Sequence, residues 1–174
     1  MRRGIALVTA AAILVLVNFS IYEKEQHLAH GEILYLELAP VDPRSLIQGD
    51  YMTLRFEIGD QIRDAVRSNG QADGEPDDTS EGYAIVRLDE QSIAHFVRLA
   101  ASNTALEEDQ RALFYRQRNG RILFATNAFF FQEGQAERYE AARYGRFRVN
   151  EQGEPLLVGL HDEGLKPLAP DNAK

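Results

Sequence analysis

The pattern of apolar and polar residues opens with a long uncharged run from Gly4 to Tyr22. Arg2 and Arg3 precede this run, and Glu23 follows it. As a helix with a rise of about 1.5 Å per residue, the run would span about 28 Å, close to the thickness of about 30 Å of a hydrocarbon core. It has no polar face, unlike a helix on the surface of a soluble domain. The pattern therefore predicts a membrane-spanning helix.

The same run differs from a cleaved secretory signal, which has a shorter apolar stretch and a small-x-small cleavage site. No Ala-x-Ala sequence follows it, so we expect an uncleaved signal-anchor. Because positive residues mark the cytoplasmic side of a membrane span, Arg2 and Arg3 place the N-terminus in the cytoplasm. In a bacterium, the chain would cross the inner membrane once through residues 4–22 and expose its C-terminal domain to the periplasm.

We expect four segments along the chain. Residues 1–22 form the cytoplasmic tip and the anchor, 23–31 a polar stalk, 32–168 the exported domain, and 169–174 a loose tail. Within the domain, residues 69–82 hold five acids and no base, a composition typical of a flexible loop. Calcium binding is the alternative, but the spacing of the loop's acids does not fit an EF-hand; four of them are Asp73, Glu75, Asp77 and Asp78.

Short alternating segments dominate the domain. Tyr51–Ile58 alternates between polar and apolar positions, the pattern of a half-buried strand. Asn119-Gly120 is a strong hairpin signal, and polar turns at 89–92 and 151–154 also join neighbouring strands. The other strands are expected at residues 33–39, 83–88, 93–100, 112–118, 121–131, 146–149 and 156–160.

Two short helices complete the predicted domain. One begins at Asp60, a suitable N-cap, with Ile58, Ile62 and Val66 near helical spacing. The other covers residues 132–144. The sum is a mainly β domain, a small barrel or rolled antiparallel sheet with one or two short helices, plus the N-terminal transmembrane helix.

Charge and cysteine content exclude several classes of function. Residues 23–174 contain 17 basic and 27 acidic residues, a net charge of −10, which argues against binding nucleic acid or an anionic lipid surface. The chain has no cysteine, so disulfides, thiolate catalysis and cysteine-type zinc sites are excluded. No dinucleotide, Walker, HExxH or GxSxG motif is present. We expect no cofactor and no metal site.

One segment, Gly49-Asp50-Tyr51-Met52-Thr53-Leu54-Arg55-Phe56, resembles the signature of the bacterial GDYXXLXY family. Gly49, Asp50, Tyr51 and Leu54 match the family name, and Phe56 stands where the name has tyrosine. The N-terminal anchor, the Pro-x-Asp-Pro-Arg run at 40–44 and the run at 133–145 agree with the resemblance. It implies a membrane-anchored protein without an assigned activity, often encoded near polytopic membrane proteins.

The signature itself has two interpretations. In the first, Gly49 supplies a turn, Asp50 binds local backbone N–H groups, and Tyr51 starts a strand. In the second, loop residues held by a rigid sheet form one rim of a polar site, which Arg55 and Glu57 could extend. The rim residues are Asp42, Arg44, Gly49, Asp50, Tyr51 and Leu54.

A second group of candidates lies in the segment 133–144. On a helix its glutamates share one face, and Glu140 and Arg143 form an i, i+3 pair. The simpler interpretation is a solvated helix edge, and the alternative is a carboxylate pair with Asp42 or Asp50 across a cleft. The candidate residues are Glu133, Tyr139, Glu140 and Arg143, and Glu137 and Tyr144 belong to the same cluster.

Nucleophilic and metal chemistry have weaker support. Gly-Asp at a strand start also resembles the signal-peptidase type of β fold, but Ser45 lies only four residues before Gly49. The exported part has three lysines, in the stalk and near the C-terminus, and none suits the role of base. His27 and His30 have the spacing of a metal pair, although polar surface is the simpler interpretation.

The hypothesis that best fits the sequence is an accessory protein without catalysis of its own. It would dock from the periplasmic side on a polytopic inner-membrane partner and bind no nucleic acid. The alternative is a small-ligand-binding or hydrolytic domain with a polar site around Asp50, Tyr51, Glu133 and Arg143.

Overall fold

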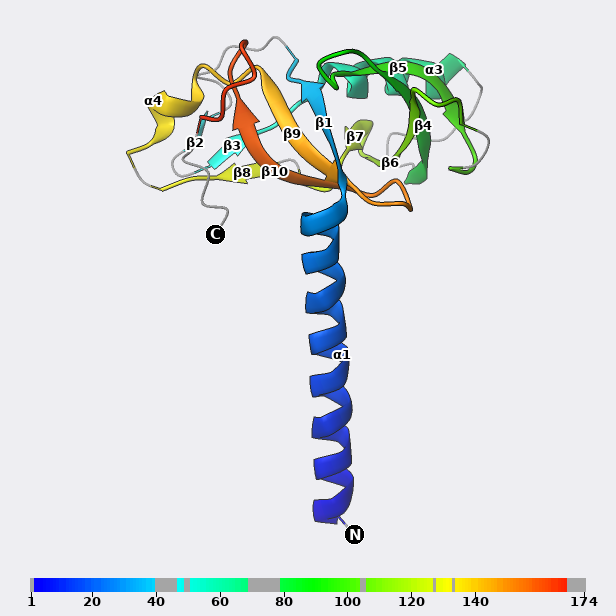
Figure 1. The fold of residues 1–174 in the computed structure, drawn as a ribbon, viewed down its shortest axis with the longest axis vertical. Coiled ribbons are helices and arrows are strands. Elements are labelled where there is room, and N and C mark those ends of the chain that lie inside the picture. Colours follow the sequence, from blue (N-terminus) through cyan, green and yellow to red (C-terminus); the bar gives the residue numbers. More distant parts are fainter. Residues whose placement is uncertain are drawn as a thin grey trace.

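The structure, a computed structural model, describes residues 2–39, 47–48, 51–68, 79–103, 106–126, 128–132 and 134–168. Side chains are described from Thr9 onward, except at residues 47–48. One long helix, α1 (Arg2–His30), projects from a domain built of short strands, and the N-terminus lies at its far end (Figure 1). Residues 23–30 of the predicted polar stalk form the last turns of this helix.

The strands of the described residues form three small antiparallel sheets. The first has the order β1-β9-β10, the second β2-β3-β8 and the third β5-β4-β6-β7. Isolated bridges join β1 to the third sheet at Tyr35 and Ile93, and to the segment after β3 at Leu38 and Phe56. The strands are β1 (Glu32–Glu37), β2 (Ile47–Gln48), β3 (Tyr51–Thr53), β4 (Ser80–Leu88), β5 (Ala94–Ala100), β6 (Gln110–Arg118), β7 (Arg121–Leu123), β8 (Ala128–Phe130), β9 (Tyr144–Val149) and β10 (Pro155–His161).

The mainly β class and the antiparallel pairing are confirmed, whereas a single rolled sheet is too simple a description. Three predicted turns are also confirmed. Asn119 and Gly120, both with positive φ, join β6 to β7. The turns at 89–92 and 151–154 join β4 to β5 and β9 to β10.

The core fills the space between these sheets and the helix α3 (Glu57–Ser68). Phe147 of β9 is among its completely buried side chains. The helix places Ile58, Ile62 and Val66 in the core, as their spacing predicts. It packs against β1, β5 and β7.

The expected strand Tyr51–Ile58 is correct in its faces and wrong in its length. Met52, Leu54, Phe56 and Ile58 are all buried, as the alternation predicts. The strand nevertheless ends at Thr53, and α3 begins at Glu57 rather than Asp60. The bridge from Phe56 to Leu38 ties the intervening segment to the end of β1, which leads the chain directly into the helix.

The predicted strand 121–131 is interrupted. It forms β7 and β8, which belong to different sheets. Between them Phe124 is buried in the core and Ala125 adopts a positive φ of 56°, so the chain changes direction. The hydroxyl of Thr126 receives the Ala128 N–H and donates to the Ala128 carbonyl, which holds the new direction.

The predicted helix 132–144 is also mostly wrong. Only α4 (Ala136–Tyr139) is helical, and Tyr144 already belongs to β9. Of the acidic loop expected at 69–82, residues 69–78 lie outside the described residues, and Ser80, Glu81 and Gly82 form the start of β4. Within the described residues, no helix combines the length and the apolar character that a membrane crossing requires.

Candidate functional site

In the described part of the family signature, residues 51–56, every second side chain (Met52, Leu54 and Phe56) is buried in the core. Of its candidate residues, Tyr51 and Leu54 are described, and Leu54 is buried. Phe56 is buried between the rings of Phe124 and Phe147, with centroid distances of 6.1 and 5.3 Å. An aromatic ring without a hydroxyl suits this position. The other four candidates, Asp42, Arg44, Gly49 and Asp50, lie outside the described residues.

Tyr51 and Tyr139, from the two predicted halves of the site, each pack against a different ring of the aromatic run 129–131. Tyr51 pairs in register with Phe130 of β8, and their ring centroids are 5.8 Å apart. Tyr139 is buried, and its ring lies 5.0 Å from that of Phe129 and 5.2 Å from that of Phe131. Because successive side chains of a strand point to opposite faces, Tyr51 and Tyr139 pack on opposite faces of β8. Glu133 lies outside the described residues, so its proposed pairing stays a prediction.

Glu140 and Arg143 are described and do not form the expected ion pair with each other. The helix that would align them ends at Tyr139. Arg143 acts through its backbone: its N–H donates to the His161 carbonyl at 2.8 Å, and its carbonyl receives the Leu38 N–H at 2.8 Å. These bonds join β1 and β10 to the chain entering β9.

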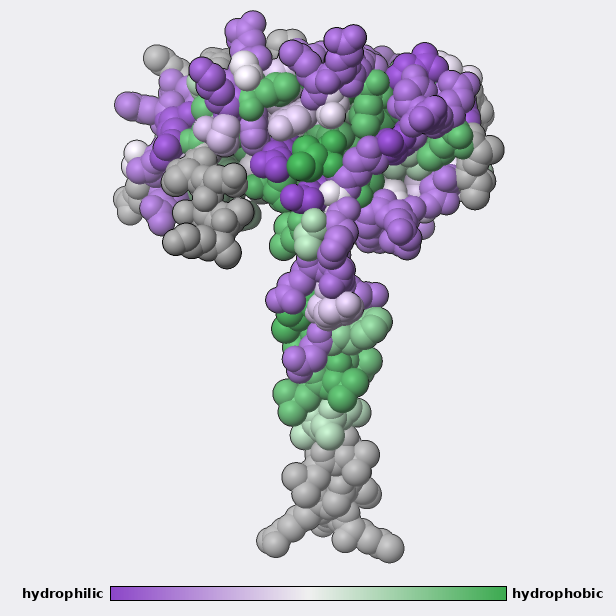
Figure 2. All heavy atoms as spheres, viewed as in Figure 1, coloured by the Kyte–Doolittle hydropathy of each residue, from purple (hydrophilic) through white to green (hydrophobic). Residues whose placement is uncertain are grey.

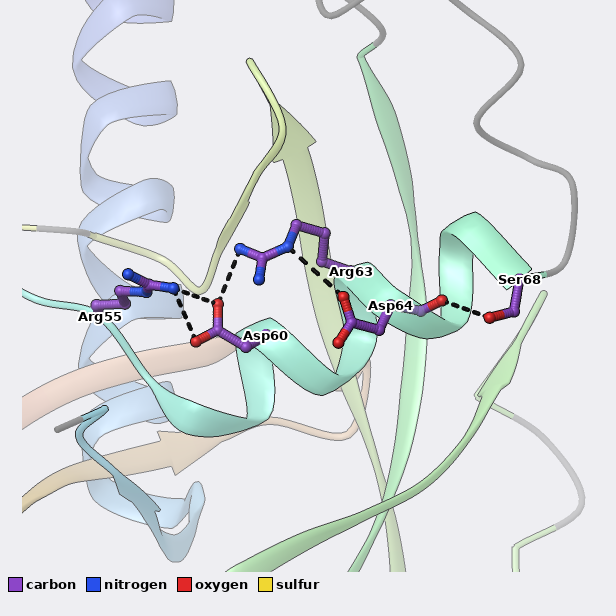
Figure 3. A network of polar contacts seen from close by, with 5 residues as sticks. All are labelled: Arg55, Asp60, Arg63, Asp64 and Ser68. Atoms are coloured by element: carbon purple, nitrogen blue, oxygen red, sulfur yellow. Dashed lines mark hydrogen bonds and ion pairs between the residues drawn. The ribbon is translucent and has the colours of Figure 1, made fainter.

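Arg55 and Glu57, which were expected to extend the polar site, lie in different surroundings. Arg55 donates two hydrogen bonds of 2.9 Å to the carboxylate of Asp60, which also pairs with Arg63 at 2.9 Å (Figure 3). Asp60 thus links two arginines across the first turn of α3, instead of capping it. Glu57 instead lines a hollow of about 190 Å³, together with Glu37 and His95.

A crevice lies between α1 and the domain, and we call it the under-domain crevice. Its volume is about 1070 Å³. The helix lines one side with residues from Phe19 to Gly31, and the β9–β10 turn at 149–154 lines the other. The five candidate site residues that the structure describes, namely Tyr51, Leu54, Tyr139, Glu140 and Arg143, line neither this crevice nor the smaller hollow. The ligand-binding alternative stays a prediction.

A set of polar contacts, which we call the stalk junction, holds α1 against the domain. The His27 side chain is buried, contrary to the surface position expected of it, and its Nε2 lies 2.9 Å from the Arg148 carbonyl. Arg148 Nη1 donates to the Ala29 and Gly31 carbonyls at 3.2 and 3.0 Å. Two residues after the end of the helix, Glu32 forms a two-point ion pair with Arg111. Arg111 and Glu32 are 79 positions apart in the sequence, so no local sequence pattern could predict this ion pair.

A second polar group surrounds Tyr144, where β1, β9 and β10 end. Burial raises the pKa of the Tyr144 hydroxyl, and the charges of Glu37, Glu163 and Asp89 raise it further, against a smaller effect of Arg143. Asp89 lies in the neighbouring turn. Its desolvation is outweighed by hydrogen bonds from His95 and from the Ile93 and Gln91 N–H groups, which lower its pKa. Among the described residues, no group of acids and histidines could hold a metal ion.

The raised pKa of Tyr144 gives a prediction for alkaline stability. The contribution of the neutral Tyr144 hydroxyl to the free energy of unfolding should be fully present below the ordinary tyrosine pKa of about 10. It should disappear as the pH rises through the higher pKa of the folded state. Tyr144→Phe should therefore flatten the loss of unfolding free energy between about pH 9 and 11. Urea unfolding across this range measures the effect. Some loss will remain, because burial also raises the pKa of Tyr115. Equal slopes in the two proteins would contradict the prediction.

Comparison with known proteins gives one match. The sequence model of the family described as GDYXXLXY protein matches residues 13–160 of this chain. No curated protein and no solved structure matches it. The matched range includes the signature, the described strands β1–β9 and nearly all of β10.

Proposed function

The chain belongs to the GDYXXLXY family, and on that premise we propose that it is a membrane-anchored accessory protein that docks on a polytopic inner-membrane partner. In this proposal residues 4–22 cross the membrane once. Arg2 and Arg3 keep the N-terminus in the cytoplasm, and the β domain stands on the periplasmic face. The domain contributes binding rather than catalysis.

A band of large apolar side chains around α1 is the observation that carries the proposal. Their exposed fractions lie between 49 and 68%. Figure 2 shows this band on the projecting helix, separated from the domain by polar residues. Contiguous exposed apolar surface of this kind marks membrane or protein contacts. The side chains are Ile13, Leu14, Val15, Leu16, Val17, Phe19, Ile21 and Tyr22.

The one amide side chain within the band also suits lipid. Asn18 donates its Nδ2–H to the Leu14 carbonyl of the same helix at 2.8 Å. A polar group in hydrocarbon has no water to bind and needs an internal partner. The side chains of residues 4–8 lie outside those described, so the proposed length of the span rests on the uncharged run of the sequence.

The domain adds a second exposed apolar group. Phe130 on β8 has an exposed fraction of 74%, although Phe129 and Phe131 beside it are partly buried. Exposed aromatic side chains are frequent at protein interfaces. This position supports a domain that binds a partner in addition to carrying an anchor.

Membrane attachment is tested with the full-length tagged chain in its native host. We expect the wild-type chain to stay with the membranes after an alkaline carbonate wash. Val15→Lys/Leu16→Lys places two charges in the proposed span, where each costs about 2.5 to 3.5 kcal/mol, and should release the chain. Leu28→Lys, on the same helix beyond the run, is the matched control and should stay attached. Release of the wild-type chain would contradict the anchor.

The docking step is tested by recovery of the tagged chain from native membranes in a mild detergent. We expect one polytopic protein in near-equal amount, identified by mass spectrometry. A chain that is recovered reproducibly alone would contradict the accessory function. Phe130→Ala should reduce recovery of the partner if the exposed ring lies in the interface.

A further inference from the structure

The under-domain crevice lies between the exposed apolar band of α1 and the underside of the β domain. It begins beside Phe19 and Tyr22, at the domain-proximal end of the exposed apolar band, and ends at the β9–β10 turn. From Tyr22 to Gly31 the helix rises about 14 Å, at about 1.5 Å per residue. With the span placed as proposed above, the crevice opens at the membrane surface, where the extramembrane segments of a neighbouring membrane protein emerge.

The contacts of the stalk junction fix the two walls of the crevice, α1 and the domain, relative to each other. His27 and Arg148 join the helix to β9 through three hydrogen bonds of 2.9 to 3.2 Å. Arg111 joins the start of β1 to β6 through its pair with Glu32, and its Nη1 also donates to the Glu108 and Gln110 carbonyls. A site whose walls are already ordered loses less conformational entropy when a partner binds.

The lining of the crevice changes character along its length. Its membrane-proximal end carries the rings of Phe19 and Tyr22. Its domain end carries Glu151 and Glu154, and within the described residues neither forms an ion pair. The charge of Glu32 is already balanced by Arg111. The charges of Glu23 and Lys24 cancel. Glu151 and Glu154 therefore give the crevice a net negative charge.

We propose that the under-domain crevice receives a basic extramembrane segment of the polytopic partner. Lysine or arginine side chains of that segment would face Glu151 and Glu154, and an apolar residue next to them would pack on Phe19 and Tyr22. The inference rests on the proposed function and names the surface and the chemistry through which it acts. Opposite charges across such a rim set partner choice and the rate of association.

A lipid headgroup is the competing occupant, and the observations favour it less. Residues 23–174 carry a net charge of −10, and the domain end of the crevice is acidic, so an anionic headgroup would be repelled. The volume of the crevice is about 1070 Å³. A polypeptide segment fills a space of that size and can present several cations along it.

Charge reversal in the crevice tests the proposal. The full-length tagged chain is recovered in mild detergent as wild type, as Glu151→Lys/Glu154→Lys, and as the control Glu90→Lys/Glu163→Lys. All four glutamates are exposed, and the control pair does not line the crevice. We expect about a tenfold loss of the polytopic partner from the crevice variant alone. Circular dichroism should show the same fold in all three proteins.

A photo-crosslinking residue gives a second readout that does not depend on affinity. Placed at Gln152 in the crevice, it should form an adduct with the same polytopic protein, whereas at Gln91 in the β4–β5 turn it should not. Peptide mapping of the adduct should find a segment with lysine or arginine outside the partner's membrane spans. An adduct with an acidic or uncharged segment would overturn the inference.

The remaining outcomes separate the inference from the function on which it rests. If the wild-type chain recovers no partner, both fail. If all three proteins recover the partner equally, the accessory function stands and the crevice is not its docking site. If the crevice variant keeps the partner but loses a lipid that co-purifies with wild type, the occupant is a lipid and the inference is overturned.

Discussion

Phe56→Ala is expected to lower the free energy of unfolding by about 3 to 5 kcal/mol, the range for removing a buried aromatic side chain. Phe56 is 5% exposed and packs edge-on against Phe124 and Phe147. It also covers Gly145, where an added Cβ would lie 2.8 Å from the Phe56 ring. Alanine would leave a cavity beside Phe124, Gly145 and Phe147.

Urea unfolding of the full-length chain in detergent measures this loss. Phe130→Ala is the matched control, since it removes the same side chain from a position that is 74% exposed. Its effect should stay within about 0.5 kcal/mol, as for most surface substitutions. Similar losses in the two variants would show that Phe56 is not the central packing residue that the structure indicates. Phe56→Tyr, which restores the tyrosine of the family signature, would show whether a hydroxyl is tolerated there.

Gly31→Val is expected to separate α1 from the domain and to cost about 1 to 3 kcal/mol, the range for overpacking. A Cβ at this position would lie 2.6 Å from the His27 carbonyl oxygen and 3.0 Å from Arg148 Cβ. The first contact is with backbone, so the end of the helix must shift. The shift would break the hydrogen bonds that Arg148 makes to the Ala29 and Gly31 carbonyls.

Hydrogen exchange in the last turn of α1 measures the separation. We expect faster exchange at residues 27–31 in the variant, with β4 and β6 unchanged. Gly159→Ala is the control, because its added Cβ would approach only His161 Cε1, at 3.9 Å. Unchanged exchange at the helix end would mean that the stalk junction tolerates a larger residue. The same variant should also weaken partner recovery if the crevice needs rigid walls.

Local sequence patterns predict the faces of the elements better than their ends. The alternation through Met52, Leu54 and Phe56 identifies the buried side chains correctly, because burial depends on which residues can leave water. The same alternation cannot indicate that the strand ends at Thr53, since that depends on a bridge between Phe56 and Leu38. Propensity favours a helix over 132–144, but pairing of Tyr144 with both β1 and β10 outweighs it.

The candidate site shows the same division. Sequence alone selected Tyr51 and Tyr139 but assigned them to a polar cleft, and the structure places them at β8, with Tyr51 against Phe130 and Tyr139 against Phe129. The order β2-β3-β8 places Tyr51 beside β8, and it pairs segments more than 70 residues apart. Nothing in the spacing of either segment encodes that pairing.

The order of residues alone was enough to identify the uncharged N-terminal run, the mainly β class, three turns and the family to which the chain belongs. Each depends on residues that are neighbours along the chain. The burial of His27 against Arg148, the pair between Glu32 and Arg111, and the crevice between α1 and the β9–β10 turn depend on long-range packing. These contacts join residues 79 and 121 positions apart, and such distances close only when the whole domain packs.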